Sequence, residues 1–432
     1  MKNMNIKTNQ QGFLEFSGKS VVELAEKYGT PLYAMDEMII RNRLKTFNQA
    51  MKEAFEEKAE VLYASKACDF LAMYRLIKEE NCGVDVVSDG EIFTAYKAGF
   101  PMEKAYFHGN NKTDSEIRFA IEKGVGTFVV DGEDELEALN QIALEYNIVQ
   151  KILIRVTPGI DPHTYEAVST GIVDCKFGSA LVTGAAEALT HKALSMDHIS
   201  LQGFHCHVGS QVFDGEVFMK CADVMFRFIK EISQKFNYEC LQLNLGGGYG
   251  IPYVEEDPYL DIEQILMRVG AHVKRLCHLY DIKLPQILME PGRSIVADAG
   301  ITLYRVGSVK KIPGVKNYVS VDGGMTDNPR YALYRSKYTM RCANRMNEEA
   351  SLRCSVVGKC CESGDILQEN VLLPDTVQRN DIIAVLCTGA YNYSMASNYN
   401  RIVRPAVVMI NGQDEKVVVQ REKFEDLIKN EL

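Results

Sequence analysis

The chain has 432 residues, of which 46% are hydrophobic and 25% charged, a composition typical of a globular protein with a large buried core. Its 48 basic and 58 acidic residues give a net charge of −10. This charge argues against a nucleic-acid binder or a polybasic membrane anchor, because both need concentrated positive charge. No apolar run approaches the roughly 18 residues that span a bilayer, and residues 1–18 lack the apolar core of a signal peptide. We therefore expect a cytoplasmic protein with no membrane partner.

Twelve cysteines are spread over this length, without a Cys-x-x-Cys pair or a zinc-ligand spacing. Most lie in apolar or helical stretches, as Cys221, Cys240 and Cys277 do, where small buried hydrophobes are expected. The adjacent pair Cys360-Cys361 cannot easily form a relaxed disulfide. The sequence therefore predicts reduced thiols in a reducing compartment.

The predicted elements begin with a short strand at 12–16 and a helix from Ser20 to Tyr28 that ends at Gly29. Strand-like runs and helix-like stretches then alternate up to about residue 290. The strand-like runs cover residues 60–65, 84–87, 105–108, 127–130, 152–156, 201–208, 241–245 and 286–290. Three of the amphipathic stretches between them begin with an Asp that is suited to cap a helix, namely 69–80, 114–123 and 134–146.

Eight strand–helix repeats predict an α/β fold with a closed (β/α)8 barrel, and an open doubly wound parallel sheet is the alternative. After about Arg293 the strand-like runs are separated by turns, which predicts a mostly β C-terminal domain. We expect residues 34–285 to form the barrel. Residues 1–33 are expected to join 286–432 in the β-rich domain.

Polar residues and glycines follow the predicted barrel strands, and reactive residues in barrels come from these C-terminal strand ends. Because the ends of a barrel's strands meet at one face, we expect these residues to converge into a polar site. In chain order the ends carry Lys66, Asp85 with Ser88, His108, Asp131, Arg155, His207, Gly246-Gly247-Gly248, and Glu290 with Arg293.

Two of these positions have competing interpretations. Lys66 is either a solvated lysine or a desolvated amine that can attach a carbonyl covalently. The run Gly246 to Gly250 follows an apolar strand, and successive glycines let backbone N–H groups approach a phosphate; a tight strand-to-helix turn is the alternative. No Gly-Lys-Ser/Thr follows, which excludes a P-loop, and the spacing differs from the dinucleotide fingerprint.

The segment from His205 to Ser210 places His205 and His207 on one face of a strand, because side chains alternate. A His-x-His pair can bind a metal. Alternatively, one imidazole stacks on a flat cofactor ring while Ser210 meets a phosphate, or the histidines belong to the core. The later strand ends offer glycines, Glu290 and Arg293 instead of further metal ligands, which disfavours the metal.

A carboxylate at Glu290 can hold a proton on a ring nitrogen or pair with Arg293. An amine, a phosphate cradle, a stacking imidazole and an acidic partner for a ring nitrogen are the four parts that pyridoxal phosphate needs.

At this point the chain resembles the fold-type III pyridoxal-phosphate-dependent decarboxylases over essentially its whole length, from the segment 28–33 to Asn400-Arg401. Tyr63-Ala64-Ser65-Lys66-Ala67 resembles the motif that carries the cofactor lysine. The segment 204–211 resembles the stacking segment, with His207 over the ring. The segments 246–250 and 290–294 resemble the phosphate loop and the ring-nitrogen carboxylate.

Three downstream segments resemble those that select the substrate in this family. Met325-Thr326-Asp327-Asn328-Pro329-Arg330 with Tyr334 resembles the segment that binds a distal carboxylate. Cys361-Glu362-Ser363-Gly364-Asp365 resembles the segment that reaches the neighbouring subunit's site, with Glu362 facing a distal amine. The region from Gly389 to Tyr391 looks like the part that contacts the phosphate.

The resemblance implies pyridoxal 5'-phosphate as cofactor, no metal, a small-molecule amino-acid substrate, and a homodimer with shared active sites. The implied catalytic residues are Lys66, Cys361, Glu290 and His207. The implied cofactor-binding residues are Lys66, Asp85, Arg155, His207, Ser210, Gly247, Gly248, Glu290, Gly292, Arg293 and Tyr391. The implied substrate-binding residues are Arg293, Arg330, Tyr334, Glu362 and Tyr391.

The implied reaction is decarboxylation of meso-2,6-diaminopimelate to L-lysine, with Cys361 or Lys66 returning the proton. A decarboxylase of lysine, ornithine or arginine is the alternative. A metal-dependent barrel hydrolase and a non-catalytic homologue are further alternatives from other functional classes.

Overall fold

The computed structural model describes residues 4–160 and 174–432 and divides into two compact units. The barrel unit comprises Arg43–Gly250 and Tyr259–Gly292, and the β unit comprises Met1–Asn42, Ile251–Pro258 and Arg293–Leu432. The boundaries expected from the sequence, 34 and 285, differ from these limits. Residue 34 lies inside a strand that pairs within the β unit, and residues 286–289 form a strand of the barrel.

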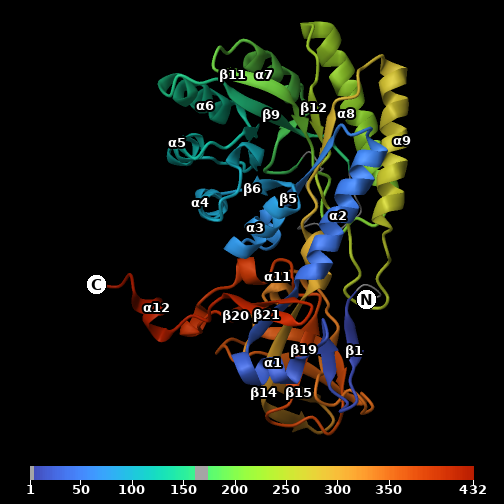
Figure 1. Ribbon diagram of the computed structural model, residues 1–432, viewed down its shortest axis with the longest axis vertical. Coiled ribbons are helices and arrows are strands. Elements are labelled where there is room, and N and C mark those ends of the chain that lie inside the picture. The colour runs from blue at the N-terminus through green and yellow to red at the C-terminus, as the bar shows by residue number, and fades with distance from the viewer. Residues whose placement is uncertain (1–3, 161–173) are drawn as a thin grey trace. The chain divides into compact units, whose positions relative to one another are not determined.

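The barrel unit contains a closed sheet of eight parallel strands, which confirms the predicted (β/α)8 fold (Figure 1). The sheet closes because its last strand pairs with its first, Ile287 with Ala59. The strands are β5 (Ala59–Ala64), β6 (Gly83–Val86), β7 (Ala105–Phe107), β8 (Thr127–Val130), β9 (Gln150–Thr157), β11 (Ile199–His205), β12 (Gln242–Asn244) and β13 (Gln286–Met289). The two-residue strand β10 (Ser179–Ala180) pairs with β9 outside this ring.

One helix leads into the first of these strands and further helices connect the strands in turn. Three of the helices begin at a different residue than the sequence predicts. The helices are α2 (Glu37–Ala54), α3 (Leu71–Glu79), α4 (Asp89–Lys97), α5 (Asp114–Glu122), α6 (Glu133–Glu145), α7 (Ala185–Leu194), α8 (Gly215–Phe236) and α9 (Ile262–Tyr280). The expected Asp caps are wrong: the capping positions of α3, α5 and α6 hold Phe70, Thr113 and Gly132. Thr113 forms a capping box with Glu116, which moves the neighbouring Asp into the first turn, where its charge still favours the helix dipole.

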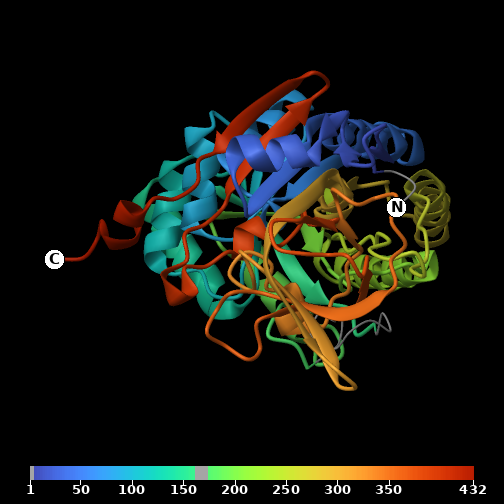
Figure 2. The same ribbon diagram turned by 90° about the horizontal axis from the view of Figure 1, so that it is seen from below.

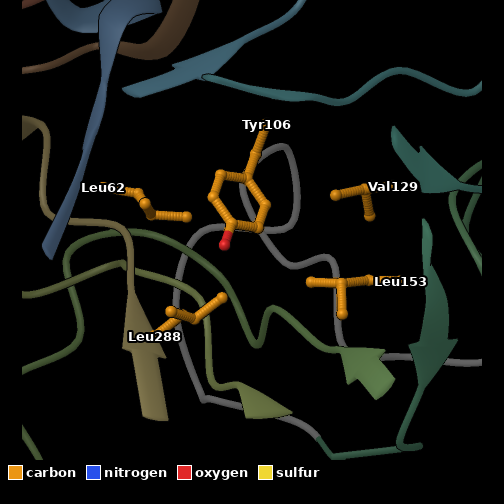
Figure 3. Packing of buried hydrophobic residues seen from close by; sticks show 5 residues of the cluster. All are labelled: Leu62, Tyr106, Val129, Leu153 and Leu288. Atoms are coloured by element: carbon orange, nitrogen blue, oxygen red, sulfur yellow. The ribbon is translucent and has the colours of Figure 1, made fainter. Parts of the chain in front are cut away.

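Apolar and aromatic side chains from five of the barrel strands fill its interior. Leu62, Tyr106, Val129, Leu153 and Leu288 are each at most 4% exposed and point toward one another (Figure 3). Branched and aromatic residues at these positions close the barrel to solvent, so reactive groups are carried at the strand ends.

The β unit combines three-stranded and nine-stranded sheets, which confirms a mostly β C-terminal domain. The small antiparallel sheet contains β1 (Ile6–Thr8), β2 (Leu14–Phe16) and β3 (Lys19–Ser20). The large sheet contains β4 (Leu32–Asp36), β14 (Gly300–Ile312), β15 (Lys316–Val321), β16 (Met340–Cys342), β17 (Leu352–Val357), β18 (Ile366–Leu373), β19 (Ile382–Leu386), β20 (Ala406–Asn411) and β21 (Asp414–Val419). Its helices are α1 (Val21–Tyr28), α10 (Arg293–Val296), α11 (Arg330–Tyr334) and α12 (Phe424–Ile428).

The N-terminal segment is built into this large sheet. Strand β4 pairs with β14 on one side and β20 on the other, so the blue and red parts of the unit lie side by side in Figure 2. The helix α1 begins after Ser20 and ends before Gly29, as the sequence predicts. Among the described residues, no helix combines the length and apolar character needed to cross a membrane.

All twelve cysteines carry free thiols, in agreement with the expectation of reduced cysteines. Cys361 is exposed, whereas its neighbour Cys360 is buried.

Candidate active site

Lys66 lies directly after the first barrel strand, in a 3-10 turn formed by Ser65–Ala67. Its Nζ is 3.3 Å from Oδ2 of Asp85, which is completely buried on the neighbouring strand β6. The register of β5 and β6 pairs Ala64 with Asp85, and this pairing brings the lysine to the carboxylate. The Lys66 side chain is 44% exposed, so its amine is held by a buried charge and stays open to a reactant.

Glu290 follows strand β13 and is the centre of a buried hydrogen-bonded group. Its Oε1 accepts a hydrogen bond from Nδ2 of Asn244 at 2.7 Å and lies 3.0 Å from Nε2 of His108. Its Oε2 lies 3.2 Å from Nε2 of His205. The two imidazole rings meet edge to face, with their centroids 4.8 Å apart. Four barrel strands thus fix the orientation of one carboxylate.

The charges in this group follow from burial and hydrogen bonding. Burial lowers the pKa of His205 to about 4, so this imidazole is neutral near pH 7 and can donate from Nε2. For Glu290, burial acts to raise the pKa, but attraction to His108 and His205 and their hydrogen bonds outweigh it and hold the pKa well below its usual range. Glu290 is therefore an ionised carboxylate in a site with little water.

The glycine run packs against the backbone of Glu290 and against His207. A Cβ atom at Gly247 would lie 2.0 Å from the carbonyl oxygen of Glu290. Gly248 has a φ of +104°, and a Cβ there would lie 2.0 Å from the carbonyl oxygen of Gly209. The backbone N–H of Gly247 donates to Nδ1 of His207 at 3.3 Å. The glycines therefore permit a close approach of backbone that any side chain would prevent.

The two histidines of the His-x-His segment have separate partners. Strand β11 ends at His205, so His207 lies beyond the strand, and the expectation that both share a strand face is wrong. His205 contacts Glu290, whereas His207 contacts the glycine turn. Ligand atoms of His108, His205 and Glu290 all lie within 4.8 Å of one another, a spacing that a metal ion could use, but their mutual hydrogen bonds already account for it.

A second group of predicted residues lies in the β unit. Nη1 of Arg293 donates to the hydroxyl of Tyr253 at 2.6 Å. The Arg293 and Arg330 guanidinium carbons lie 4.9 and 5.4 Å from the ring centroid of Tyr391, and Arg330 also lies 5.2 Å from the ring of Tyr334. Both arginines are 6% exposed. Within the described chain, Nε of Arg330 has no hydrogen-bond partner, and no carboxylate forms an ion pair with this guanidinium.

The remaining predicted residues are less closely tied to these groups. Nε of Arg155 lies 4.0 Å from Oδ1 of Asp131, and its guanidinium stacks on Phe177 at 4.4 Å. Ser210 is partly buried. A Cβ at Gly292 would lie 2.9 Å from the Cβ of Ala64, directly before the Lys66 turn.

Cys361 and Glu362 lie on an exposed turn of the β unit. The backbone N–H of Cys361 donates to Oδ1 of Asn400 at 2.7 Å, and Oε1 of Glu362 accepts from the N–H of Gly364 at 3.0 Å. These two hydrogen bonds fix the turn that carries the side chains of Cys361 and Glu362.

Sequence reasoning did not assign two residues that orient this machinery. Asn244 ends strand β12, and its position directly before the glycine run was the available signal. Tyr253, which holds Arg293, lies in the short segment 251–258 that belongs to the β unit, and no local pattern distinguishes it.

Known proteins are similar to this chain in sequence and in fold. Residues 39–297 match the family model described as the pyridoxal binding domain of pyridoxal-dependent decarboxylases. The chain belongs to this family of pyridoxal-dependent decarboxylases.

Within the family, its relatives are diaminopimelate decarboxylases. It is 47% identical over 424 residues to that of Bacillus subtilis (strain 168), with 98% of this chain and 96% of the relative covered. It is 42% identical to that of Staphylococcus aureus (strain COL), with 99% and 100% covered. A crystal structure of diaminopimelate decarboxylase from M. jannaschii in complex with L-lysine matches with a TM-score of 0.91 and 33% identity, covering 100% of this chain and 98% of that one.

The residues of the barrel unit fit pyridoxal phosphate. Lys66 offers an amine beside a buried carboxylate, Glu290 offers an ionised carboxylate, and the glycine turn offers closely packed backbone. Oδ1 of Asp85 is buried and has no hydrogen-bond donor among the described residues, which leaves it available to a cationic group of the cofactor complex.

Proposed function

We propose that this protein decarboxylates meso-2,6-diaminopimelate to L-lysine and CO2 with pyridoxal phosphate as its cofactor. Relatives that match nearly the full length of the chain at 42–47% identity are named diaminopimelate decarboxylases. The alternative is decarboxylation of lysine, ornithine or arginine on the same fold. The observation that favours diaminopimelate is the buried Arg330, whose Nε has no hydrogen-bond partner within the described residues.

In the barrel unit, Nζ of Lys66 would hold the cofactor covalently, and Asp85 would keep this amine oriented. Bound pyridoxal phosphate supplies a sink for the electrons that remain when a substrate carboxylate leaves as CO2. Glu290 is the group suited to hold a proton on a ring nitrogen, because it is ionised, hydrogen-bonded to Asn244 and His205, and 3.0 Å from Nε2 of His108. His207 and the glycine turn are proposed to contact the ring and the phosphate, with Ser210 and Arg155 supporting them.

In the β unit, Arg330 and Tyr334, together with Arg293, are proposed to bind the carboxylate at the distal end of the substrate. Two guanidinium groups lie beside the ring of Tyr391, and their positive charge favours binding of an anionic group such as a carboxylate. Lysine, ornithine and arginine lack a distal carboxylate, so they would leave Arg330 buried and unpaired. A site of this kind discriminates by about 10⁴-fold against substrates that lack the partner group.

The test compares kcat/KM for meso-diaminopimelate, lysine, ornithine and arginine in the wild type and in Arg330→Ala. We expect the wild type to have a much higher kcat/KM for diaminopimelate than for the other three amino acids. In Arg330→Ala, kcat/KM for diaminopimelate should fall, and the ratio of kcat/KM for diaminopimelate to that for lysine should decrease. Arg341→Ala is a matched control, because Arg341 is an arginine of the same unit whose Nη1 donates to the carbonyl of Met340. Equal or faster turnover of ornithine or lysine by the wild type would support the alternative decarboxylase instead.

We also propose that the protein acts in the cytoplasm as a homodimer in which each active site takes Cys361 and Glu362 from the second subunit. The support is chemical. Glu362 is an exposed carboxylate suited to a substrate ammonium, and Cys361 is an exposed thiol suited to return a proton. Both lie about 300 positions after Lys66 in the sequence.

Mixing inactive Lys66→Ala with inactive Glu362→Ala subunits tests the shared site. A heterodimer would contain one site with both defects and one intact site, so part of the activity should return. Tagged subunits must show that exchange has occurred. Exchange without recovered activity would contradict the shared site.

A further inference from the structure

Beneath Lys66, a buried glutamate shares a serine hydroxyl with the backbone. Oγ of Ser65 lies 2.6 Å from the carbonyl oxygen of Asp85 and 2.6 Å from Oε2 of Glu91. Ser65 is completely buried, and Glu91 is 9% exposed. The same Oε2 of Glu91 accepts the backbone N–H of Val87 at 2.8 Å. None of these contacts is used by the reaction described above.

The proton count of this group determines the state of Glu91. A serine hydroxyl has one proton to donate, and a backbone carbonyl can only accept. If Glu91 were ionised, two acceptors would compete for the single proton of Ser65 at 2.6 Å each. If Glu91 is a neutral carboxylic acid, its O–H donates to Ser65, and the Ser65 proton is free for the carbonyl of Asp85. Only the neutral form satisfies all the short contacts.

The surroundings of Glu91 favour the same form. Burial raises its pKa to about 7, and the negative charges of Asp85 and Asp69 add to the effect, whereas the hydrogen bonds from Ser65 and Val87 oppose it. From helix α3 the phenol of Tyr74 faces the same group, and its own pKa is raised well above the usual value by burial and by Glu91. The cation Lys66 lies 3.3 Å from Asp85, whose backbone carbonyl Ser65 contacts.

We propose that Glu91 is a positioning residue that acts in its protonated form: it donates to Ser65, which lets Ser65 tie the Lys66 turn to the backbone of Asp85. This inference rests on the assignment of Lys66 as the cofactor lysine. Loss of the Glu91 proton withdraws the Ser65 hydrogen from Asp85 and places a second negative charge behind the one that holds Lys66. The Lys66 turn then loses its hydrogen bond to the backbone of Asp85, and the added negative charge changes the electrostatic field at the Lys66 amine.

The first experiment uses the cofactor-free protein and infrared spectroscopy of protonated carboxyl groups. Wild type and Glu91→Gln are compared across about pH 5 to 9, with Glu60→Gln as the matched control. Glu60 is a partly buried carboxylate on strand β5, which precedes the Lys66 turn, and burial also raises its pKa. Burial also raises the pKa of Asp69 to about 6 and of Asp327 to about 7, so these residues give components of their own. The readout is therefore the wild-type minus Glu91→Gln difference spectrum, in which we expect a protonated-carboxyl component that disappears near neutral pH and that Glu60→Gln retains. Absence of this component from the difference spectrum would overturn the proposal.

The second experiment measures kcat and KM of the loaded enzymes against pH. If the protonated form positions Lys66, kcat of wild type and of Glu60→Gln falls by up to about tenfold per pH unit above the pKa of Glu91, with KM little changed. Glu91→Gln cannot ionise, so its kcat should lack this fall. Retention of the wild-type fall in Glu91→Gln would overturn the proposal.

A third variant separates positioning from folding. Glu91→Ala removes the donor and should lower kcat at every pH. Glu91→Gln should restore part of it, because an amide N–H in place of Oε2 can donate to Ser65 but no longer accepts the N–H of Val87. Equal kcat values per folded protein in the two variants would overturn the proposal. If no variant or wild type binds pyridoxal phosphate, the proposed function fails, whereas the infrared difference still determines whether Glu91 carries the proton.

Discussion

Replacing Glu290 with Gln separates the charge of this residue from its role in the fold. Gln keeps one oxygen for Asn244 and His108, which both approach Oε1, and places an amide NH2 opposite His205. His205 can adapt, because its Nδ1 has no hydrogen-bond partner in the described part of the chain, so the proton can move there and let Nε2 accept. The cost to the fold is then about one hydrogen bond to a charged group, roughly 1.5–3 kcal/mol.

The cost to the reaction is larger, since the carboxylate charge that would stabilise a protonated ring nitrogen is lost. Removing one such preorganised electrostatic partner typically lowers kcat by about 10²–10³-fold. We therefore expect Glu290→Gln to fold and retain cofactor, measured by its absorbance, while CO2 release slows by about that factor. Glu60→Gln, at the opposite end of a barrel strand, provides the control. A kcat of Glu290→Gln within about threefold of wild type would refute the reasoning.

Two further predictions concern the same buried group. The pKa of His205 is lowered from 6.5 to about 4 in the folded protein, so the unfolded chain binds the extra proton first as the pH falls. The stability difference between wild type and His205→Gln should therefore be constant above about pH 6.5 and change by up to about 3 kcal/mol toward pH 4, in urea melts of cofactor-free protein. If the stability difference between wild type and His205→Gln stayed constant from about pH 7 to about pH 4, His205 would not be the group that titrates. Dialysis against a chelator should leave the rate of decarboxylation unchanged, because His108 and His205 contact Glu290 and are not expected to bind a metal. Loss of activity with recovery on adding zinc would favour the metal-dependent hydrolase.

The sequence predicted the barrel well because each strand is a short apolar run that ends in a polar residue or glycine. Lys66, Asp85, His108 and Glu290 could be placed together for this reason: parallel strands of a closed sheet end at one face. The strand-face pairing of His205 and His207 failed because strand β11 stops one residue after Phe204.

Contacts between residues far apart in the chain could not be predicted from the local sequence pattern. Nothing in the local sequence of Tyr253 indicates that it holds Arg293, and the partners of Glu91 become visible only when β5 and β6 are in register. Two of the Asp caps failed for a local reason: α5 begins with a Thr-x-x-Glu capping box, and α6 begins after Gly132, two residues before Asp134.

The central place of β4 in the large sheet of the β unit has a consequence for how the protein is made. Its partner strands, β14 and β20, begin at Gly300 and Ala406, whereas β4 ends at Asp36. At a synthesis rate of roughly 5–20 residues per second, β4 waits about 13–50 s for its first partner to leave the ribosome. During that time nearly the whole barrel is synthesised. An apolar strand with both edges open is thus present throughout barrel folding, and slower translation would lengthen the period in which it can pair with another chain.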